Sequence, residues 1–360
     1  MINFAVGPVE SPQSVLALGA LDSPYFRTGE FSEVVLESER ILLSLLNAPE
    51  GSRVCFVTGS GTAAMESVVA SVLNEHDHAL VVDGGSFGHR FRQMLELHGV
   101  PHEAIELIGG TPLERGHLPI NGYGSHTALL VNIHETSTGI LYDAELLADY
   151  CRENDLLFIV DAISSFLADP LDMSRLGADV VITGSQKALA CPPGVSVVVL
   201  SPRAQERIEN KSCPSMYLSL GLMLENGVRG QTPFTPAVTI ILQIHQRLRE
   251  IEAVGIGAEI CKVASIAALF RREASELPFE MRLTSPSNAA TYCTCDFSAR
   301  DLFERLKEEY GIWICPNGGP HADTSFRVGH IGALERSDVR LLIAAMHDLN
   351  RRGFMTRGGE

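Results

Sequence analysis

The feature that most constrains the fold is a pair of apolar runs, each followed by polar residues. Leu156–Val160 and Ala178–Ile182 are rich in Val, Ile and Leu. Such runs are typical of strands in a parallel sheet, which is buried on both faces. Asp161 follows the first run, and Lys187 lies in a polar loop just past the second. Because open α/β sheets bind ligands at the carboxyl ends of their strands, we expect both side chains at one edge.

The composition is that of an acidic globular protein. The 360 residues are 45% hydrophobic and 20% charged, and the formal net charge is −16. This charge disfavours nucleic acid and anionic membranes as partners, and no apolar run approaches the length of a membrane span. The eight cysteines form no C-x-x-C pair and the N-terminus does not resemble a signal peptide. We therefore expect reduced thiols and a cytoplasmic location.

The length predicts two domains, since 360 residues exceed what one compact core usually accommodates. Strands and helices alternate through residues 15–254, which we expect to form a large ligand-binding domain. A boundary is predicted near Gly255, because a long helical segment ends there and a second helix-strand alternation begins. Residues 255–360 are then a smaller α/β domain, and residues 1–14 are expected to pack against it.

A glycine-rich turn, Gly59-Ser60-Gly61-Thr62, follows the predicted strand Val54–Val57 and opens a helix. Backbone N–H groups at a helix start attract an anion. The next strand ends in Asp83, so the segment matches the dinucleotide fingerprint and would suit NAD. It suits the phosphate of pyridoxal phosphate (PLP) equally well, and the segment alone leaves both ligands open.

Asp161 and Lys187 favour PLP. That cofactor needs a lysine for its Schiff base and a carboxylate that keeps its pyridine nitrogen protonated. Two further polar loops follow apolar strands: one carries Phe87, which could stack on a flat ring, and the other runs from His134 to Gly139. His76-Asp77-His78 lacks a third ligand nearby, so no metal site is predicted.

Several segments together resemble the class V (fold type I) PLP-dependent aminotransferases. Gly184–Leu189, followed by Pro192-Pro193-Gly194, resembles the catalytic segment of alanine–glyoxylate and serine–pyruvate aminotransferases. His134–Gly139 and Phe326–Gly332 also resemble the 2-aminoethylphosphonate–pyruvate aminotransferases. The resemblance implies an α/β fold whose large domain holds a mostly parallel seven-stranded sheet, with a smaller C-terminal α/β domain.

The resemblance also implies residue roles. Lys187 would form the internal aldimine and move the proton, and Asp161 would pair with the pyridine nitrogen. Arg327 would bind the substrate carboxylate bidentately. Thr232 would reach the phosphate of a neighbouring subunit, which implies a homodimer. The other cofactor-binding positions are the phosphate residues Gly61, Thr62 and Gln186, the stacking residue Phe87, and the hydroxyl of Thr136.

We therefore expect an aminotransferase that moves an amino group from alanine, serine or 2-aminoethylphosphonate to pyruvate or glyoxylate. Arg229 is displaced by one position from the arginine of the phosphonate enzymes, so the donor is left open. Lyase or desulfurase chemistry on the same fold is an alternative, for which Cys315 is the candidate nucleophile. An NAD-dependent dehydrogenase is an alternative from another class, and a non-catalytic binding protein is disfavoured because both Lys187 and Asp161 are present.

Overall fold

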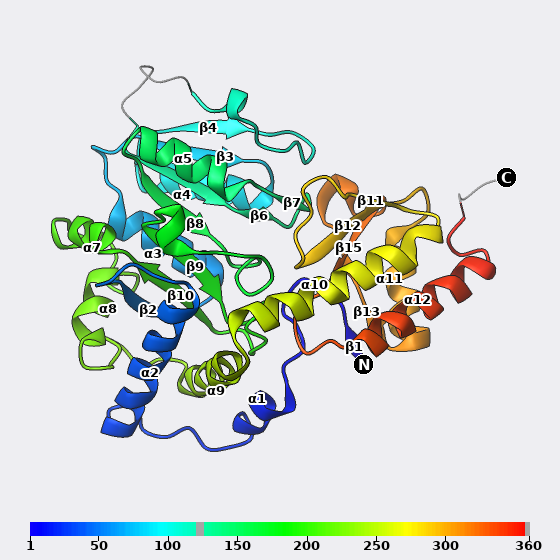
Figure 1. Ribbon diagram of the computed structural model, residues 1–360, viewed down its shortest axis with the longest axis horizontal. Helices are drawn as coiled ribbons and strands as arrows, with labels where there is room; N and C mark the ends of the chain where they lie inside the picture. Colours follow the sequence, from blue (N-terminus) through cyan, green and yellow to red (C-terminus); the bar gives the residue numbers. More distant parts are fainter. Residues whose placement is uncertain (120–125, 357–360) are drawn as a thin grey trace.

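The computed structural model describes residues 1–119 and 126–356, and Figure 1 shows a larger and a smaller α/β lobe. The larger lobe is built on a seven-stranded sheet in the order β2-β10-β9-β8-β5-β3-β4. Within this sheet β10 is antiparallel to both neighbours and the other adjacent pairs are parallel, so the predicted mostly parallel sheet is confirmed. The strands are β2 (Arg53–Thr58), β3 (Ala79–Asp83), β4 (His102–Glu106), β5 (Ala128–Asn132), β8 (Leu157–Asp161), β9 (Val180–Gly184) and β10 (Val195–Leu200).

Both faces of this sheet are covered by helices, as the apolar runs predict (Figure 1). Side chains alternate along each strand: Val54 and Phe56 enter the core on one face, and Cys55 and Val57 enter the core on the other. One core includes side chains of α2 (Gly29–Leu45), α5 (Ala144–Glu153) and α9 (Val238–Val254), and the other those of α3 (Gly61–Val72), α4 (Ser86–Leu97), α7 (Pro202–Glu209) and α8 (Leu220–Gly227).

The smaller lobe has a four-stranded sheet in the order β11-β12-β15-β14, packed against helices around its own core. Its elements are β11 (Glu280–Met281), β12 (Ala290–Thr294), β14 (Cys315–Pro316), β15 (Ser325–Gly329), α10 (Ile256–Glu273), α11 (Ala299–Tyr310) and α12 (Arg336–Arg351).

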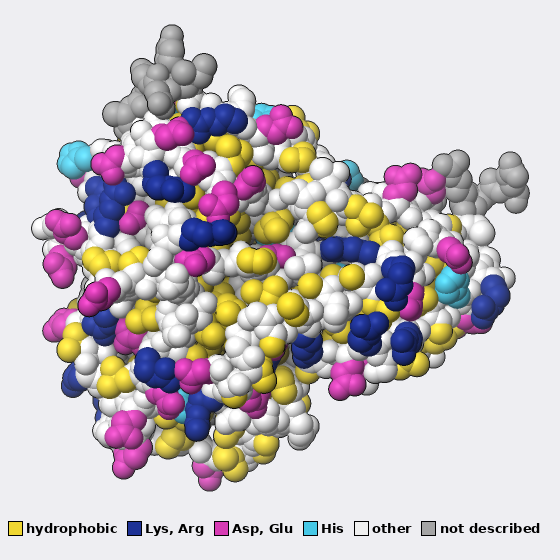
Figure 2. Space-filling model, in the orientation of Figure 1, with side chains coloured by type: hydrophobic (Ala, Val, Ile, Leu, Met, Phe, Trp, Pro, Cys, Tyr) yellow, Lys and Arg dark blue, Asp and Glu magenta, His cyan; other side chains and the backbone are white. Residues whose placement is uncertain are grey.

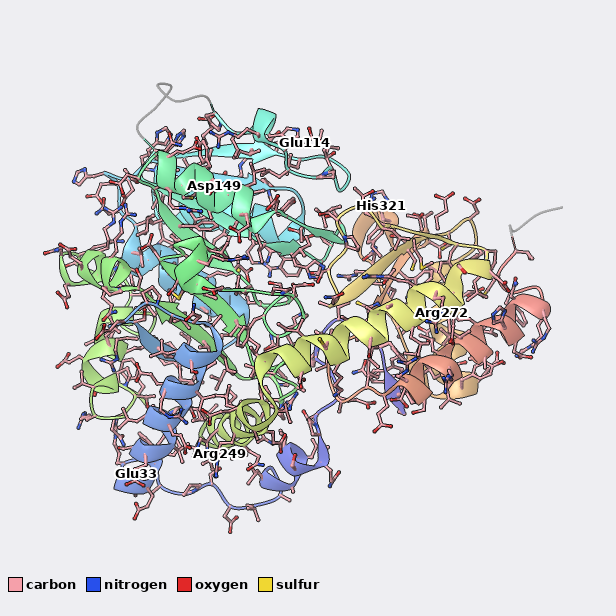
Figure 3. All side chains as sticks on the ribbon, in the orientation of Figure 1. Glu33, Glu114, Asp149, Arg249, Arg272 and His321 are labelled. Atoms are coloured by element: carbon pink, nitrogen blue, oxygen red, sulfur yellow. The ribbon has the colours of Figure 1, made fainter. Side chains whose placement is uncertain are left out.

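Helices α9 and α10 meet at Gly255 with a bend of 94°, and Figure 3 marks Arg249 on α9 and Arg272 near the far end of α10. Helix α10 contributes Val263 to the larger lobe and Ile266 to the smaller core. The division into domains 15–254 and 255–360 therefore remains a prediction.

The N-terminal segment lies against the smaller lobe and reaches the larger one. Strand β1 (Ile2–Asn3) pairs with β13 (Ile312–Trp313), and the carbonyl of Phe4 accepts a 2.7 Å hydrogen bond from the Gly329 amide. The Val9 amide then donates to the Gln186 carbonyl over 3.3 Å. The segment thus joins the two lobes. The remaining α-helices and strands are α1 (Gln13–Leu18), α6 (Met173–Leu176), β6 (His134–Glu135) and β7 (Ile140–Leu141).

Acidic and basic side chains are interspersed over the face shown in Figure 2. In the part of the chain that the structure describes, no single helix has the length and apolar composition of a membrane span, and only the bent pair α9 and α10 would pass that test together. All eight cysteines are free thiols.

Candidate active site

Asp161 and Lys187 line one cavity of about 190 Å³ at the carboxyl ends of β8 and β9. The two strands are parallel neighbours, so the residues that follow them emerge on the same edge of the sheet. Seven of the predicted site residues line this cavity: Gly61, Thr62, Phe87, Thr136, Asp161, Gln186 and Lys187.

The Asp161 carboxylate is held rigidly at the cavity wall. It is 1% exposed and accepts hydrogen bonds from Asn132 Nδ2 at 2.7 Å and from the Ile163 amide at 2.9 Å. Burial raises the pKa of Asp161 to about 6, because removal from water penalises the charged form, while both hydrogen bonds oppose this increase. Asn132 is the last residue of β5, and sequence analysis did not select it.

The pKa of Lys187 is shifted in the opposite direction to that of Asp161. Burial, followed by the positive charge of Arg327, lowers its pKa to about 8. Its Nζ donates a 2.7 Å hydrogen bond to the carbonyl of Val6, from the N-terminal segment. A side chain at Gly7 would lie 2.6 Å from Lys187 Cδ, so this close approach requires glycine. A backbone carbonyl leaves no residue-type signal in the sequence, so this contact could not be predicted.

Helix α3 begins at the cavity, as the glycine-rich turn predicts. Its N-cap residue Ser60 makes no side-chain capping bond, which leaves the first turn available to an anion. A Cβ atom at Gly61 would lie 2.3 Å from Ile163 Cδ1, so the backbone and the cavity wall are in close contact here.

Phe87 and Arg90, from the N-terminal part of α4, also line the cavity. The Glu135 carboxylate fixes the start of α4 by accepting hydrogen bonds from the amides of Phe87 and Gly88, both at 3.0 Å. The Arg90 guanidinium lies 5.0 Å from the centroid of the Phe87 ring. Sequence analysis missed Arg90, although a position three residues after Phe87 shares its helix face.

Two buried polar side chains, those of His134 and Ser164, are in contact next to the cavity. His134 Nδ1 is 3.0 Å from Ser164 Oγ, and Ser164 lines the cavity. Burial, with the positive charges of Lys187 and Arg327, lowers the pKa of His134 to about 3. His134 is therefore neutral at physiological pH.

Arg327 reaches this region from β15 of the smaller lobe. Its Nη1 donates to the Thr136 carbonyl at 3.3 Å, and its Nη2 lies 3.2 Å from Cys315 Sγ. Among the described residues it forms no ion pair with a carboxylate, so its charge is available to an anionic ligand. Cys315 lies in the short strand β14 rather than on a loop over the cavity, which does not favour the desulfurase alternative.

Thr232 does not join the cavity. Its hydroxyl donates to the Phe234 carbonyl at 2.7 Å, and it lines a separate hollow with Tyr217 and Phe234. If Thr232 contacts a phosphate, that phosphate must therefore belong to another copy of the chain.

The strand order argues against the dinucleotide alternative. A dinucleotide fingerprint needs its two strands side by side, whereas four strands separate β2 from β3. At a spacing of about 4.8 Å per strand, Asp83 is roughly 24 Å from the glycine-rich turn. Asp83 instead pairs with His89 at 3.1 Å and with Arg92 at 3.6 Å.

Comparison with known proteins agrees with this geometry. Residues 24–226, more than half of the chain, match the sequence profile of the family described as "Aminotransferase class-V". The chain is 30% identical to the "Soluble hydrogenase 42 kDa subunit" of Anabaena cylindrica over 94% of this chain and 90% of that protein. It is 27% identical to the L-aspartate–glyoxylate aminotransferase of Paracoccus denitrificans over 92% and 86% of the two chains.

The chain is also 27% identical to the 2-aminoethylphosphonate–pyruvate transaminase of Salmonella paratyphi C, over 94% of this chain and 95% of that protein. Among solved structures, the subgroup IV aspartate aminotransferase of Thermus thermophilus superposes with a TM-score of 0.90 at 26% identity, over 98% and 99% of the two chains.

Proposed function

Because the chain belongs to the class V aminotransferases, a family of PLP-dependent enzymes, we propose that it binds PLP in the cavity between α3, α4 and the ends of β8 and β9. The observation that carries this proposal is the placement of Asp161 and Lys187 in one small cavity, with the pKa of the carboxyl raised to about 6 and that of the amine lowered to about 8. Such opposed shifts are common among groups that exchange protons in catalysis.

Unpaired polar atoms at the cavity indicate that it takes a polar ligand. Gln186 Oε1 and Asn132 Oδ1 are buried and lack a hydrogen-bond partner among the described residues. The open first turn of α3 suits a phosphate, and the Phe87 ring suits a flat heterocycle. When bound, PLP withdraws electrons from the substrate Cα and makes its C–H bond acidic.

Residues of this chain would then orient the cofactor and accept the proton. Asp161, fixed by Asn132 and the Ile163 amide, would place its negative charge next to the ring nitrogen. The Lys187 amine is partly neutral near pH 8 and would therefore accept a proton readily. The Val6 carbonyl would hold Nζ by the 2.7 Å hydrogen bond when the amine is free.

We infer that Arg327 binds the carboxylate of a small 2-oxo acid, pyruvate or glyoxylate. Its guanidinium has no carboxylate partner among the described residues, and a planar fork of donors suits a carboxylate or a phosphonate. The donors consistent with such a site are alanine, serine and 2-aminoethylphosphonate. The similarity to a glyoxylate enzyme and to a phosphonate enzyme supports both acceptors without choosing between the donors.

We also propose that the active unit is a homodimer in which Thr232 meets the phosphate of the partner. Support comes from the loop itself: Arg27 Nη1 donates to the Thr232 carbonyl at 2.8 Å and to Gln231 Oε1 at 3.2 Å, which holds the loop away from the cavity of its own chain. A cytoplasmic location remains a prediction, and the free cysteines are consistent with it.

The direct test is a matrix of alanine, serine and 2-aminoethylphosphonate against pyruvate and glyoxylate, with products separated by chromatography. We expect at least one pair to react, with the product amino acid appearing as fast as the donor disappears. If 2-aminoethylphosphonate is inert while alanine or serine reacts, the phosphonate donor is wrong. If every pair is inert with a PLP-loaded protein, the proposed substrate class is wrong.

A further inference from the structure

We propose that Arg90 provides the side-chain positive charge that binds the phosphate of the cofactor, an inference that rests on the proposed PLP site. Arg90 lies on α4 and lines the same cavity as Lys187 and Asp161. Its Nη1 donates a 3.1 Å hydrogen bond to Thr62 Oγ1, in the first turn of α3. The guanidinium is thus at the turn that is open to an anion.

No carboxylate of the described residues compensates the charge of Arg90. Among the described residues it forms no ion pair, although the chain has a formal net charge of −16. Arg92, two positions along the same helix, provides a contrast: it pairs with Asp83, Glu96 and Glu106 at 2.8 to 3.6 Å. An arginine without a carboxylate partner at a cavity wall is available to an anionic ligand.

A phosphate needs more positive charge than the helix terminus supplies. A phosphate monoester carries about 1.5 to 2 negative charges at neutral pH, whereas a helix N-terminus contributes only about half a positive charge. Two other cations near the site have other proposed roles: Lys187 would form the Schiff base, and Arg327, on β15 of the smaller lobe, would bind the substrate carboxylate. Arg90 uses Nη1 on Thr62 and has further N–H donors to offer.

The competing explanation is that Arg90 only supports the stacking ring, since it also lies over Phe87. The two roles differ in which part of the cofactor they affect. A ring support affects the binding of any pyridoxal, whereas a phosphate partner affects only the phosphorylated form.

The test is to titrate the cofactor-free protein with PLP and with pyridoxal, which lacks the phosphate, and to follow binding by visible absorbance. Arg90→Met should weaken PLP binding by about ten- to a hundred-fold, which is the effect of losing a charged hydrogen bond. It should change pyridoxal binding by less than about threefold, since only the phosphate contact is lost. Arg90→Lys should lie between Arg90→Met and the wild type, because it keeps the charge but not the fork. Arg92→Met is the matched control and should leave both affinities unchanged.

An equal loss of PLP and pyridoxal affinity, or no loss of either, would overturn the assignment. If Arg90→Met does not fold, as judged by circular dichroism, the salt dependence of ligand binding to the wild-type protein provides the test. The affinity for PLP should fall with ionic strength while the affinity for pyridoxal does not. A parallel change of both affinities would refute the proposal. A wild-type protein that binds neither ligand would instead refute the PLP site itself.

Discussion

Replacing Asp161 by asparagine should stabilise the cofactor-free protein and also lower its activity. Asp161 is 1% exposed, and burial raises its pKa from the ordinary 3.8 to about 6. The folded state therefore disfavours the ionised carboxyl. This penalty is fully present above the folded pKa and disappears as the pH falls below the unfolded pKa. A difference of roughly two pKa units corresponds to about 3 kcal/mol.

Asparagine removes this penalty and keeps the shape of the side chain. The Ile163 amide can still donate to the amide oxygen, and Asn132 can accept from the new amide nitrogen through Oδ1, which has no partner among the described residues. We therefore expect Asp161→Asn to raise the free energy of unfolding by up to about 3 kcal/mol near pH 7.5 and by only about 1 kcal/mol near pH 4.5.

Urea unfolding of the cofactor-free proteins at the two pH values measures this difference, with Asp22→Asn, at an exposed position, as the control for the change in charge. In the presence of PLP, the same variant should be at least about 100-fold slower in turnover, since a preorganised charge has been removed. A variant that is less stable at pH 7.5, or equally stabilised at both pH values, would refute the burial argument. Unchanged turnover would refute the role of Asp161.

Three other predictions follow from the site. Arg327→Lys keeps the charge and loses the fork, so it should raise KM for the oxo acid and lower kcat/KM by roughly 10- to 100-fold, whereas unchanged steady-state constants would refute the carboxylate contact. Analytical ultracentrifugation should show a homodimer, and Thr232→Val should weaken PLP binding. A fully active monomer at assay concentration would contradict the proposed dimer. Because the reactive form of Lys187 is the neutral amine, the rate of PLP incorporation should rise with pH and level off above about pH 8, and a rate independent of pH between 6 and 9 would contradict the lowered pKa.

The sequence predicted the central sheet because near-continuous apolar runs are required when both faces of a strand are buried. Asp161 and Lys187 were found for a related reason: polar residues directly after such strands lie at one edge of a parallel sheet. The direction of β10 was not predictable from its residues, because a strand buried on both faces has the same apolar composition in either direction. The order of the strands was likewise hidden, and it is this order that separates Asp83 from the glycine-rich turn.

The missed parts of the site depend on contacts between distant segments. The carbonyl of Val6 approaches Lys187 through backbone geometry, and Asn132 appears in the sequence only as the end of an apolar strand. Arg90 is one of many arginines in the chain. Only the positions of the surrounding carboxylates show that, within the described parts of the chain, Arg90 forms no ion pair while Arg92 forms three.

The central claim is that Lys187 holds the cofactor. Borohydride reduction of the PLP-loaded protein, followed by proteolysis and mass spectrometry, tests it most directly. We predict one pyridoxyl group per chain, attached to the peptide that contains Lys187, and no labelled peptide in a Lys187→Ala variant that remains folded. A label on another lysine, or normal transamination by Lys187→Ala, would contradict the claim.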